Sequence, residues 1–218
     1  MSSEAGRDSE YLLPCDNLVF AAGPWTPQQV ALLFPHSAID LAPATLAGDW
    51  LLLKNPAPVE EKSTASVFFN HIVGEKLEFS GRNDGTIWVC GRTNPSAKLP
   101  PLGTEALPDT DLLADLTDYS RRFVRESEIS EKGGPRVVAK GRAFRPVRQS
   151  GLPLITSVSA QSLASQATFS SIRQRSGVFI CYGHGSYGVS MGMGSGKLMA
   201  QVIYEDKPDI DISKFTLH

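Results

Sequence analysis

The chain has few of the features that assign a protein to a class at once. Its three cysteines, Cys15, Cys90 and Cys181, are an odd number without C-x-x-C spacing, which argues against a disulfide framework and indicates reduced thiols. The four histidines are too scattered to predict a metal site. No apolar run approaches the roughly 18 residues of a membrane-spanning helix, and the polar start lacks the hydrophobic stretch of a signal peptide. We therefore expect a cytoplasmic protein without metal or membrane span.

An excess of charge of either sign is also missing. Lys and Arg total 21 and Asp and Glu total 23, which gives a net charge of −2 at pH 7. A chain without net positive charge has no electrostatic reason to bind nucleic acid or an anionic membrane, so neither partner is expected. The hydrophobic share of 41% is ordinary for a globular protein, and 218 residues suffice for one or two domains.

Glycine is abundant at one place. Seven of the 19 glycines fall within residues 177–196, where a predicted strand over 178–182 leads into G-x-G-x-x-G at Gly183, Gly185 and Gly188. Glycines let the backbone approach a ligand closely, and the N-terminus of a following helix offers unpaired N–H donors with partial positive charge. The pattern indicates a cradle for a phosphate or a polar ring. Alternatively, it is only a tight turn that enters a helix.

The position of this motif excludes two common nucleotide sites. A dinucleotide-binding βαβ unit needs a second strand after its helix and an acidic residue about 20 positions beyond the first glycine. Glu205 has suitable spacing, but only residues 209–212 remain to form a strand. A P-loop is excluded because Lys197 is followed by Leu198 instead of Ser or Thr. We therefore predict a terminal strand, a glycine turn and a helix over 188–204 that points at a molecule bound by the rest of the protein.

The remaining pattern predicts an α+β fold with a mostly antiparallel sheet and one long helix. Asn83-Asp84-Gly85 predicts a hairpin turn, and apolar spacing predicts an amphipathic helix from 109 to about 130. Thr26 is expected to cap a first helix that has Pro27 in its first turn. Residues 94–108 and 159–176 are expected to be mainly loops. Strands are expected at 18–22, 39–41, 49–54, 64–71, 76–80, 86–90, 136–143 and 152–158, the last two separated by an Arg-Pro turn.

Three segments resemble the D-amino-acid oxidase and glycine oxidase superfamily of FAD-dependent oxidoreductases, in the family's order. Residues 16–25, Asp-Asn-Leu-Val-Phe-Ala-Ala-Gly-Pro-Trp, are similar to the strand and Gly-x-Trp turn beside the cofactor. Residues 144–148, Phe-Arg-Pro-Val-Arg, with Gly-Leu-Pro-Leu-Ile at 151–155, resemble the family's Arg-Pro strand pair. Residues 182–190, Tyr-Gly-His-Gly-Ser-Tyr-Gly-Val-Ser, resemble the Tyr-Gly-His-Gly-Gly-Tyr-Gly motif whose backbone meets the flavin ring.

The resemblance implies a set of binding residues and no catalytic side chain, because the flavin supplies the redox chemistry. Arg145 is the implied anchor for a substrate carboxylate, with Ser186 and Tyr187 beside the substrate; the alternative for Arg145 is a surface cation at a strand end. The implied FAD contacts are Ala22, Gly23, Gly183, Gly185, Ser186, Tyr187, Gly188, Val189 and Ser190.

Other residues keep two interpretations. His184 is either a proton relay or a packing and hydrogen-bonding residue of the turn. Tyr187 either lines the substrate pocket or covers the start of the helix. Gly23 is either a point of close backbone approach to the cofactor or a plain strand-to-helix turn. We interpret Trp25 as a core residue and Arg148 as a solvated neighbour of Arg145.

The chain departs from the family most clearly at its start. Family members open with a glycine loop that holds the ADP half of FAD, and residues 1–15 show no such loop. We therefore expect the chain to correspond to the C-terminal part of such an enzyme, with a partial FAD-binding segment over 1–35, a substrate domain over 36–143 and a C-terminal FAD-contacting segment over 144–218. Smaller departures are Ser186 and Thr156, where the family often has glycine, and Met193.

The implied activity is oxidation of an amino acid or amine by hydride transfer to flavin, incomplete in this chain as it stands. We expect the isolated chain to purify without stoichiometric flavin and without oxidase turnover. The apolar faces of 18–22 and 178–182 are expected to be exposed and to favour association. The alternative is a non-catalytic remnant or interaction protein that folds but binds no flavin.

Overall fold

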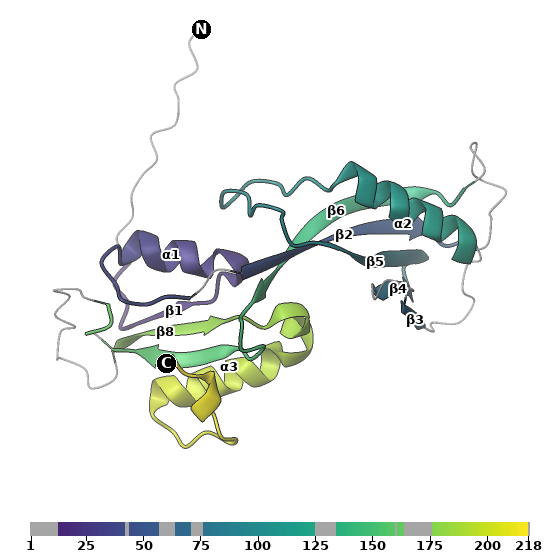
Figure 1. The fold of residues 1–218 in the computed structure, drawn as a ribbon. Helices are drawn as coiled ribbons and strands as arrows, with labels where there is room; N and C mark the ends of the chain where they lie inside the picture. Colours follow the sequence, from purple (N-terminus) through teal and green to yellow (C-terminus); the bar gives the residue numbers. More distant parts are fainter. Residues whose placement is uncertain are drawn as a thin grey trace, which may run out of the picture.

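The computed structural model of the protein describes residues 13–41, 44–56, 64–70, 76–124, 134–159, 161–163 and 176–217. These residues form a three-stranded sheet and a five-stranded sheet, joined by the long strands β2 and β6 that run between them in Figure 1. Helices lie against both sheets, so the architecture is α+β as predicted.

The three-stranded sheet holds the two ends of the described chain together. Its central strand, β8 (Gly177–Tyr182), pairs in parallel with β1 (Asn17–Phe20) and antiparallel with β7 (Leu154–Val158). The helix α1 (Thr26–Leu33) lies on one side of this sheet in Figure 1, and α3 (Gly188–Tyr204) lies on the other. The predicted last strand and last helix are both confirmed.

Strict alternation along β8 explains why a helix covers each face. Ile180 and Tyr182 share a core cluster with Val30 of α1, whereas Phe179 packs in a second cluster with Leu198 of α3. Successive side chains of a strand point to opposite faces, so an apolar run such as this needs cover on both. The expectation that the faces of residues 178–182 would be exposed is therefore wrong. In β1, Phe20 is buried as well, Leu18 is partly buried and Val19 is exposed.

The five-stranded sheet is antiparallel throughout and is covered by a helix on one face. The helix α2 (Thr110–Phe123) packs there, with Leu113 and Leu116 over Leu77 and Phe79. The carboxylate of Asp109 caps α2 by accepting hydrogen bonds from two backbone N–H groups of its first turn, which fixes where the helix begins. The strand order is β3 (Ser66–Asn70), β4 (Lys76–Gly81), β5 (Thr86–Asn94), β2 (Ala44–Lys54) and β6 (Val137–Val147).

A buried ion pair also joins α2 to the sheet. Arg142 of β6 donates from Nε to Asp49 Oδ1 at 2.6 Å and from Nη2 to Asp49 Oδ2 at 2.8 Å. The Asp49 side chain is fully buried and also accepts from the backbone N–H of Asp109 at 3.1 Å. The hydrogen bond to Asp49 raises the pKa of Arg142. Because every oxygen of this buried carboxylate has a donor, the pair is compatible with burial under α2.

Several local predictions need correction. Residues 39–41 form no strand, because the segment after α1 folds back on the helix instead of pairing with a sheet. Thr26 is the first residue of α1 and not its cap; its hydroxyl is buried without a hydrogen-bond partner. Arg145 and Pro146 lie within β6, paired with β2, so the turn follows them rather than containing them. The helix expected to reach about 130 ends at Phe123.

Other local predictions hold. Gly85 has φ +78° at the hairpin between β4 and β5, as the Asn-Asp-Gly sequence predicted. Residues 95–109 are a loop, and residues 125–130 and most of 159–176 lie outside the described residues. The division at 35/36 and 143/144 stays a prediction, although β6 continues without a break from 143 to 144.

Candidate functional site

Two glycine turns lie next to each other at the carboxyl ends of parallel strands. β1 leads into Gly23, with φ +55°, and β8 leads into Gly183 and Gly185, with φ +88° and +57°. Such backbone angles strongly favour glycine. A Cβ added at Gly23 or Gly185 would meet no atom within 4 Å, so the space beside these two glycines is open. The carboxyl ends of parallel strands are where open α/β sheets bind ligands.

The predicted cofactor residues after the second turn are exposed at the start of α3. Tyr187 is 67% and Val189 97% exposed, and Ser186, Gly188 and Ser190 are exposed too. A helix start leaves its first N–H groups without partners inside the helix. The short helical turns at 23–25 and 185–187 both contact β6, the strand that carries Arg145. The structure thus brings together the three segments that the sequence singled out.

His184 fastens the second turn to α3. Its Nε2 lies 2.8 Å from Oγ of Ser195, a side chain that is 5% exposed, and burial lowers the pKa of His184. This contact agrees with the interpretation of His184 as a hydrogen-bonding residue of the turn and gives no support to a proton relay. Ser195 lies two helical turns into α3, so the bond ties the glycine turn to the body of the helix.

Arg148 has a structural contact that the sequence did not predict. A Cβ on Gly183 would lie 2.6 Å from Cδ of Arg148, so the arginine stem crosses the turn where glycine leaves room. Its Nη1 donates to the backbone oxygen of Leu152 at 3.2 Å. Arg148 is therefore half-buried and packs against the turn, so it is more than a solvated neighbour of Arg145.

Arg145 lies over the bare backbone of β2. It pairs with Leu46 across the β2–β6 ladder, and a Cβ on Gly48 would be only 2.3 Å from its Nη1. Gly48 is thus the residue that lets the guanidinium lie flat against the sheet. Nη1 is buried and has no hydrogen-bond partner. An unpaired buried donor costs about 1–3 kcal/mol, and an anion placed there would relieve that cost.

The face of the five-stranded sheet opposite α2 carries a row of five cross-strand neighbours. Cross-strand pairing places Phe68, Glu78, Cys90, Trp50 and Gly141 side by side on five successive strands. These residues alternate with those that pack under α2, so they lie on the other face. We call this surface, together with Gly48 and Arg145, the open face.

An aromatic shelf forms part of the open face. The rings of Trp50 and Trp88 stack with centroids 4.6 Å apart, and the Arg82 guanidinium lies 5.3 Å from the Trp88 ring. A Cβ on Gly141 would be 2.5 Å from the Trp50 ring, so this glycine lets the ring settle on β6. The sequence analysis missed the shelf, although strand alternation places both tryptophans opposite the core face.

Glu78 and Cys90 form a polar pair within the same row. Ser80 Oγ donates to Glu78 Oε1 at 2.8 Å, and Cys90 Sγ donates to Oε2 at 3.6 Å. Burial raises the pKa of the Cys90 thiol, the Glu78 charge raises it further, and the Arg145 charge opposes the rise. Both charges therefore act on the thiol from the same open face.

Two further polar atoms near the glycine turns have no partner. Thr26 directly follows the turn at 23–25, and Tyr182 directly precedes the second turn; the hydroxyls of both residues are buried. The open glycine turns and the exposed start of α3 fit the polar ring of a flavin. The sequence contains no second G-x-G-x-x-G for the ADP end.

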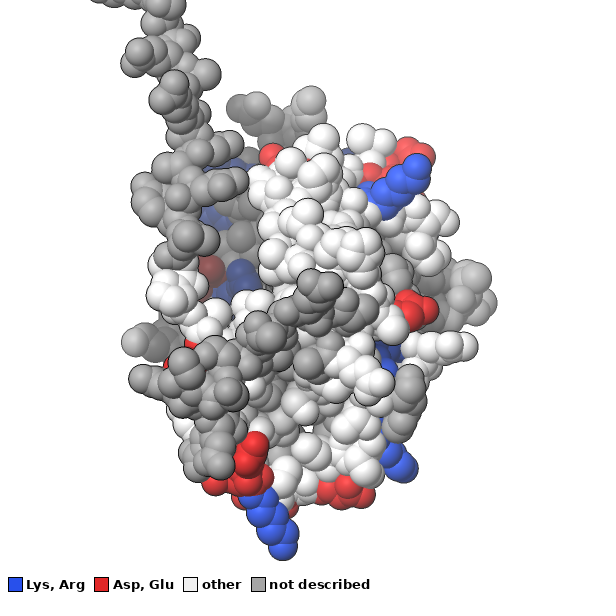
Figure 2. Space-filling model, turned by 90° about the vertical axis from the view of Figure 1, so that its left-hand side faces the viewer, with Lys and Arg blue, Asp and Glu red and all other residues white. Residues whose placement is uncertain are grey.

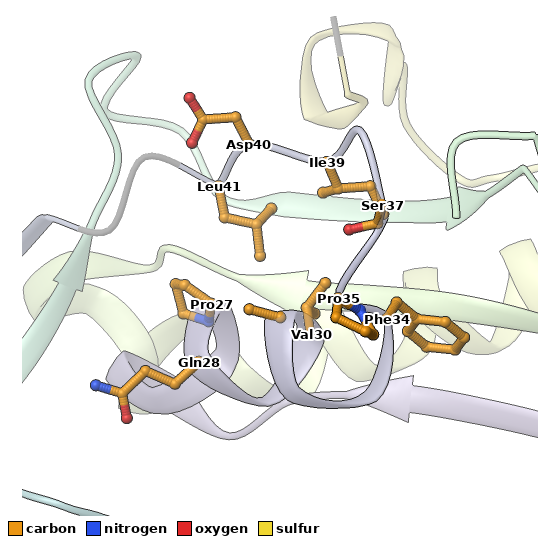
Figure 3. Close-up of a pocket in the computed structure, with 10 residues that line it drawn as sticks. Pro27, Gln28, Val30, Phe34, Pro35, Ser37, Ile39, Asp40 and Leu41 are labelled. Carbon is orange, nitrogen blue, oxygen red and sulfur yellow. The ribbon is translucent and has the colours of Figure 1, made fainter. Parts of the chain in front are cut away.

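A separate groove lies along α1. Figure 3 shows Leu41 pointing toward Pro27 and Val30 of α1, with Asp40 pointing away at the edge of the groove. Its volume is about 390 Å³, and none of the predicted site residues lines it. On the face shown in Figure 2, charged side chains lie mainly toward the edges. The described residues include neither a cluster suited to a metal ion nor a helix able to cross a bilayer.

Comparison with known proteins adds a family match. The family model described as FAD dependent oxidoreductase (DAO) matches residues 3–202. A protein of Schizosaccharomyces pombe named as an oxidoreductase is 22% identical over 199 residues, which are 87% of this chain and 42% of that protein.

Solved structures share the fold. Glycine oxidase from Geobacillus kaustophilus superposes with a TM-score of 0.64 at 17% identity, covering 92% of this chain and 44% of that one. L-amino acid deaminase from Proteus vulgaris superposes with a TM-score of 0.63 at 14% identity, covering 93% of this chain and 51% of that one. Iminodiacetate oxidase from Chelativorans sp. BNC1 superposes with a TM-score of 0.60 at 15% identity, covering 94% of this chain and 46% of that one. The chain spans about half or less of the length of each relative.

Proposed function

Because the chain belongs to the family of FAD-dependent oxidoreductases, we propose that it supplies the substrate-binding face and the ring-contacting turns of an enzyme that oxidises an amino acid or an amine. One observation carries this proposal. The two open glycine turns at the ends of β1 and β8 both contact β6, the strand from which Arg145 extends with an unpaired buried donor.

Each group has a separate task in this proposal. Flavin, when bound, supplies the hydride acceptor for the carbon that bears the amine. The backbone at Gly23 and Gly183–Ser190 would contact the ring, and N–H groups at the start of α3 would stabilise negative charge on it. Arg145 would hold a substrate carboxylate through its guanidinium, and the shelf of Trp50 and Trp88 would exclude water beside the reacting carbon. No side chain of this chain is assigned a chemical step.

A titration of the chain with FAD and with riboflavin tests the proposed ring contact. We expect both ligands to bind with similar, weak affinity, because this chain offers turns for the ring and no second glycine loop for the ADP half. Gly185→Ala should weaken both, since the new Cβ would fill the open space before the turn. Gly85→Ala is the matched control, with positive φ and open space at the β4–β5 hairpin. Quenching of flavin fluorescence measures the binding.

The outcomes separate the alternatives. Binding of FAD far tighter than of riboflavin, with peroxide formed from an amino acid, would show that our account of a chain confined to the ring end is wrong. Absence of binding by either flavin would favour the non-catalytic alternative. Equal losses from the two alanine variants would mean that the effect is strain and not contact. A cytoplasmic location and the correspondence to a C-terminal part remain predictions.

A further inference from the structure

The open face carries a carboxylate that the proposed function does not use. Glu78 lies on β4 with its side chain directed away from the core under α2, and it is partly buried. We propose that Glu78 binds a cationic nitrogen of the same substrate whose carboxylate Arg145 holds, so that the site selects molecules that carry both charges. This inference rests on the proposed function and adds a second specificity residue to it.

The sheet places the two charges on either side of one strand. Glu78 pairs directly with Cys90 of β5, and Cys90 pairs with Trp50 of β2. Arg145 extends from β6 and lies over Gly48 of β2. Both charges act on the Cys90 thiol, one from each side. A molecule lying over Cys90 and Trp50 would therefore have an anion site at one end and a cation site at the other.

The partners of Glu78 leave its charge uncompensated. Ser80 and Cys90 donate one hydrogen bond to each carboxylate oxygen, and both donors are neutral. Within the described ranges no cation forms an ion pair with Glu78. An ionised carboxylate has about four acceptor positions, so room for another donor remains. Because a partly desolvated charge is stabilised most by an opposite charge, a cationic nitrogen is the favoured ligand.

Arg145 does not fill this role itself. Its guanidinium lies over Gly48 of β2, and β2 lies two strand spacings of about 4.8 Å each from β4. Its Nη1 has no hydrogen-bond partner, and Glu78 does not pair with it. Two opposite charges held apart on one flat surface suit a zwitterion that bridges them. The stacked rings of Trp50 and Trp88 provide a floor for the carbon atoms between its charges.

The tryptophans allow a direct test on the 218-residue chain. Each of the three indole N–H groups gives its own NMR signal, and Trp50 and Trp88 lie on the open face. Trp25 is the internal reference, because it lies in the turn after β1 and not on the open face, and its Nε1 donates to the Pro100 oxygen. Titrations use propionate, propylamine, alanine and lysine as probes. They compare the wild type with Glu78→Gln, which keeps the side-chain shape and removes the charge.

We expect alanine or lysine to shift the signals of Trp50 and Trp88 at concentrations roughly tenfold or more below those needed for propionate, as a charge-assisted hydrogen bond provides. In Glu78→Gln, alanine and lysine should need the same concentration as propionate to shift these signals, and the concentration of propionate needed should not change. Glu105→Gln, an exposed carboxylate in the loop before α2, is the matched control and should change nothing. A spectrum with native dispersion confirms that each variant is folded.

Each result supports or overturns the proposal. A preference shared by alanine and lysine supports it with the α-nitrogen as ligand, and a preference for lysine alone supports it with a side-chain nitrogen. Equal binding of propionate, alanine and lysine to the wild type overturns the role of Glu78 and leaves the proposed function standing. If propionate shifts neither indole signal, or if its effect survives Arg145→Ala, the carboxylate anchor itself is wrong, and both proposals fall.

Discussion

The two sheets of the molecule differ in how they are covered. The three-stranded sheet has α1 on one face and α3 on the other, whereas among the described residues α2 alone covers the five-stranded sheet, on one face. In the first, polar chemistry is confined to the turns at the strand ends, Gly23 and Gly183–Ser190. In the five-stranded sheet, polar groups such as Glu78 and Arg145 lie across the whole face opposite α2. Groups free to bind a ligand therefore gather where the cover of helices ends.

The covered faces also differ in chemistry. Both core clusters of the three-stranded sheet are apolar, with side chains such as Ile155 and Ile180 almost fully buried. The face under α2 adds the Asp49–Arg142 pair to its apolar cluster, within reach of the helix cap at Asp109. The stability of the five-stranded sheet under α2 therefore depends on the ion pair between Asp49 and Arg142 staying intact.

Removing that charge should produce the largest effect. Asp49→Ala leaves Arg142 buried without its partner and takes an acceptor from the start of α2, so we expect a loss of about 3–5 kcal/mol in the free energy of unfolding. Asp118→Ala breaks an exposed pair with Arg121 within α2 and should cost less than about 1 kcal/mol. Urea unfolding followed by tryptophan fluorescence measures both. Equal losses would contradict the special role of the buried pair.

Hydrogen exchange shows whether the two sheets respond separately. If the three-stranded sheet depends mainly on its own apolar clusters, Asp49→Ala should lower amide protection in β5 much more than in β8. Equal loss of protection in both strands would mean that the two sheets unfold as one cooperative unit. The sheets would then differ in the side chains of their covered faces and not in stability.

A smaller effect is expected from glycines of the β4–β5 hairpin. At Gly91, φ is +137° and a Cβ would lie 1.9 Å from the backbone oxygen of Lys76, so Gly91→Ala must push two strands apart. Gly85 has φ +78° with open space, so its replacement by alanine meets backbone strain alone. We expect losses of about 2–4 kcal/mol and about 1 kcal/mol respectively, measured by urea unfolding. A reversed order would contradict the close approach of β4 to Gly91.

Sequence patterns predicted the elements that are determined locally. The Asn-Asp-Gly turn fixed Gly85, apolar spacing predicted α2, and the glycine cluster with its apolar strand predicted β8 and α3. Residues 39–41 look like a strand by their apolar content, but a strand also needs a partner, and this segment folds against α1 instead. Local pattern does not determine such long-range pairing.

The candidate site divides in the same way. Gly23, Gly183 and Gly185 are visible in the sequence because their positions at strand ends carry a local pattern. Glu78 and Gly48 are not, because their importance arises from cross-strand neighbours far along the chain: Cys90 for one and Arg145 for the other. Alternation in β4 shows that Glu78 faces away from Leu77 and Phe79, but only the register shows what lies beside it.

The smallest expected effect concerns the turn at the end of the three-stranded sheet and depends on pH. Burial lowers the pKa of His184 in the folded protein, whereas an unfolded histidine titrates near about 6.5. Below that pH the unfolded chain takes up the proton more readily. The contribution of His184 to stability is therefore fully present above about pH 6.5 and is lost as the pH falls toward its lower folded pKa.

His184→Gln removes the titration and keeps a polar group that can reach Ser195. We expect the stability of the wild type relative to this variant to decrease between pH 8 and pH 5.5, as measured by urea unfolding at each pH. His36→Gln, which replaces an exposed histidine before residues 37–41, is the matched control. If the difference between wild type and His184→Gln were the same at both pH values, the imidazole would not be held neutral at the turn. The link between the glycine turn and α3 would then rest on the backbone alone.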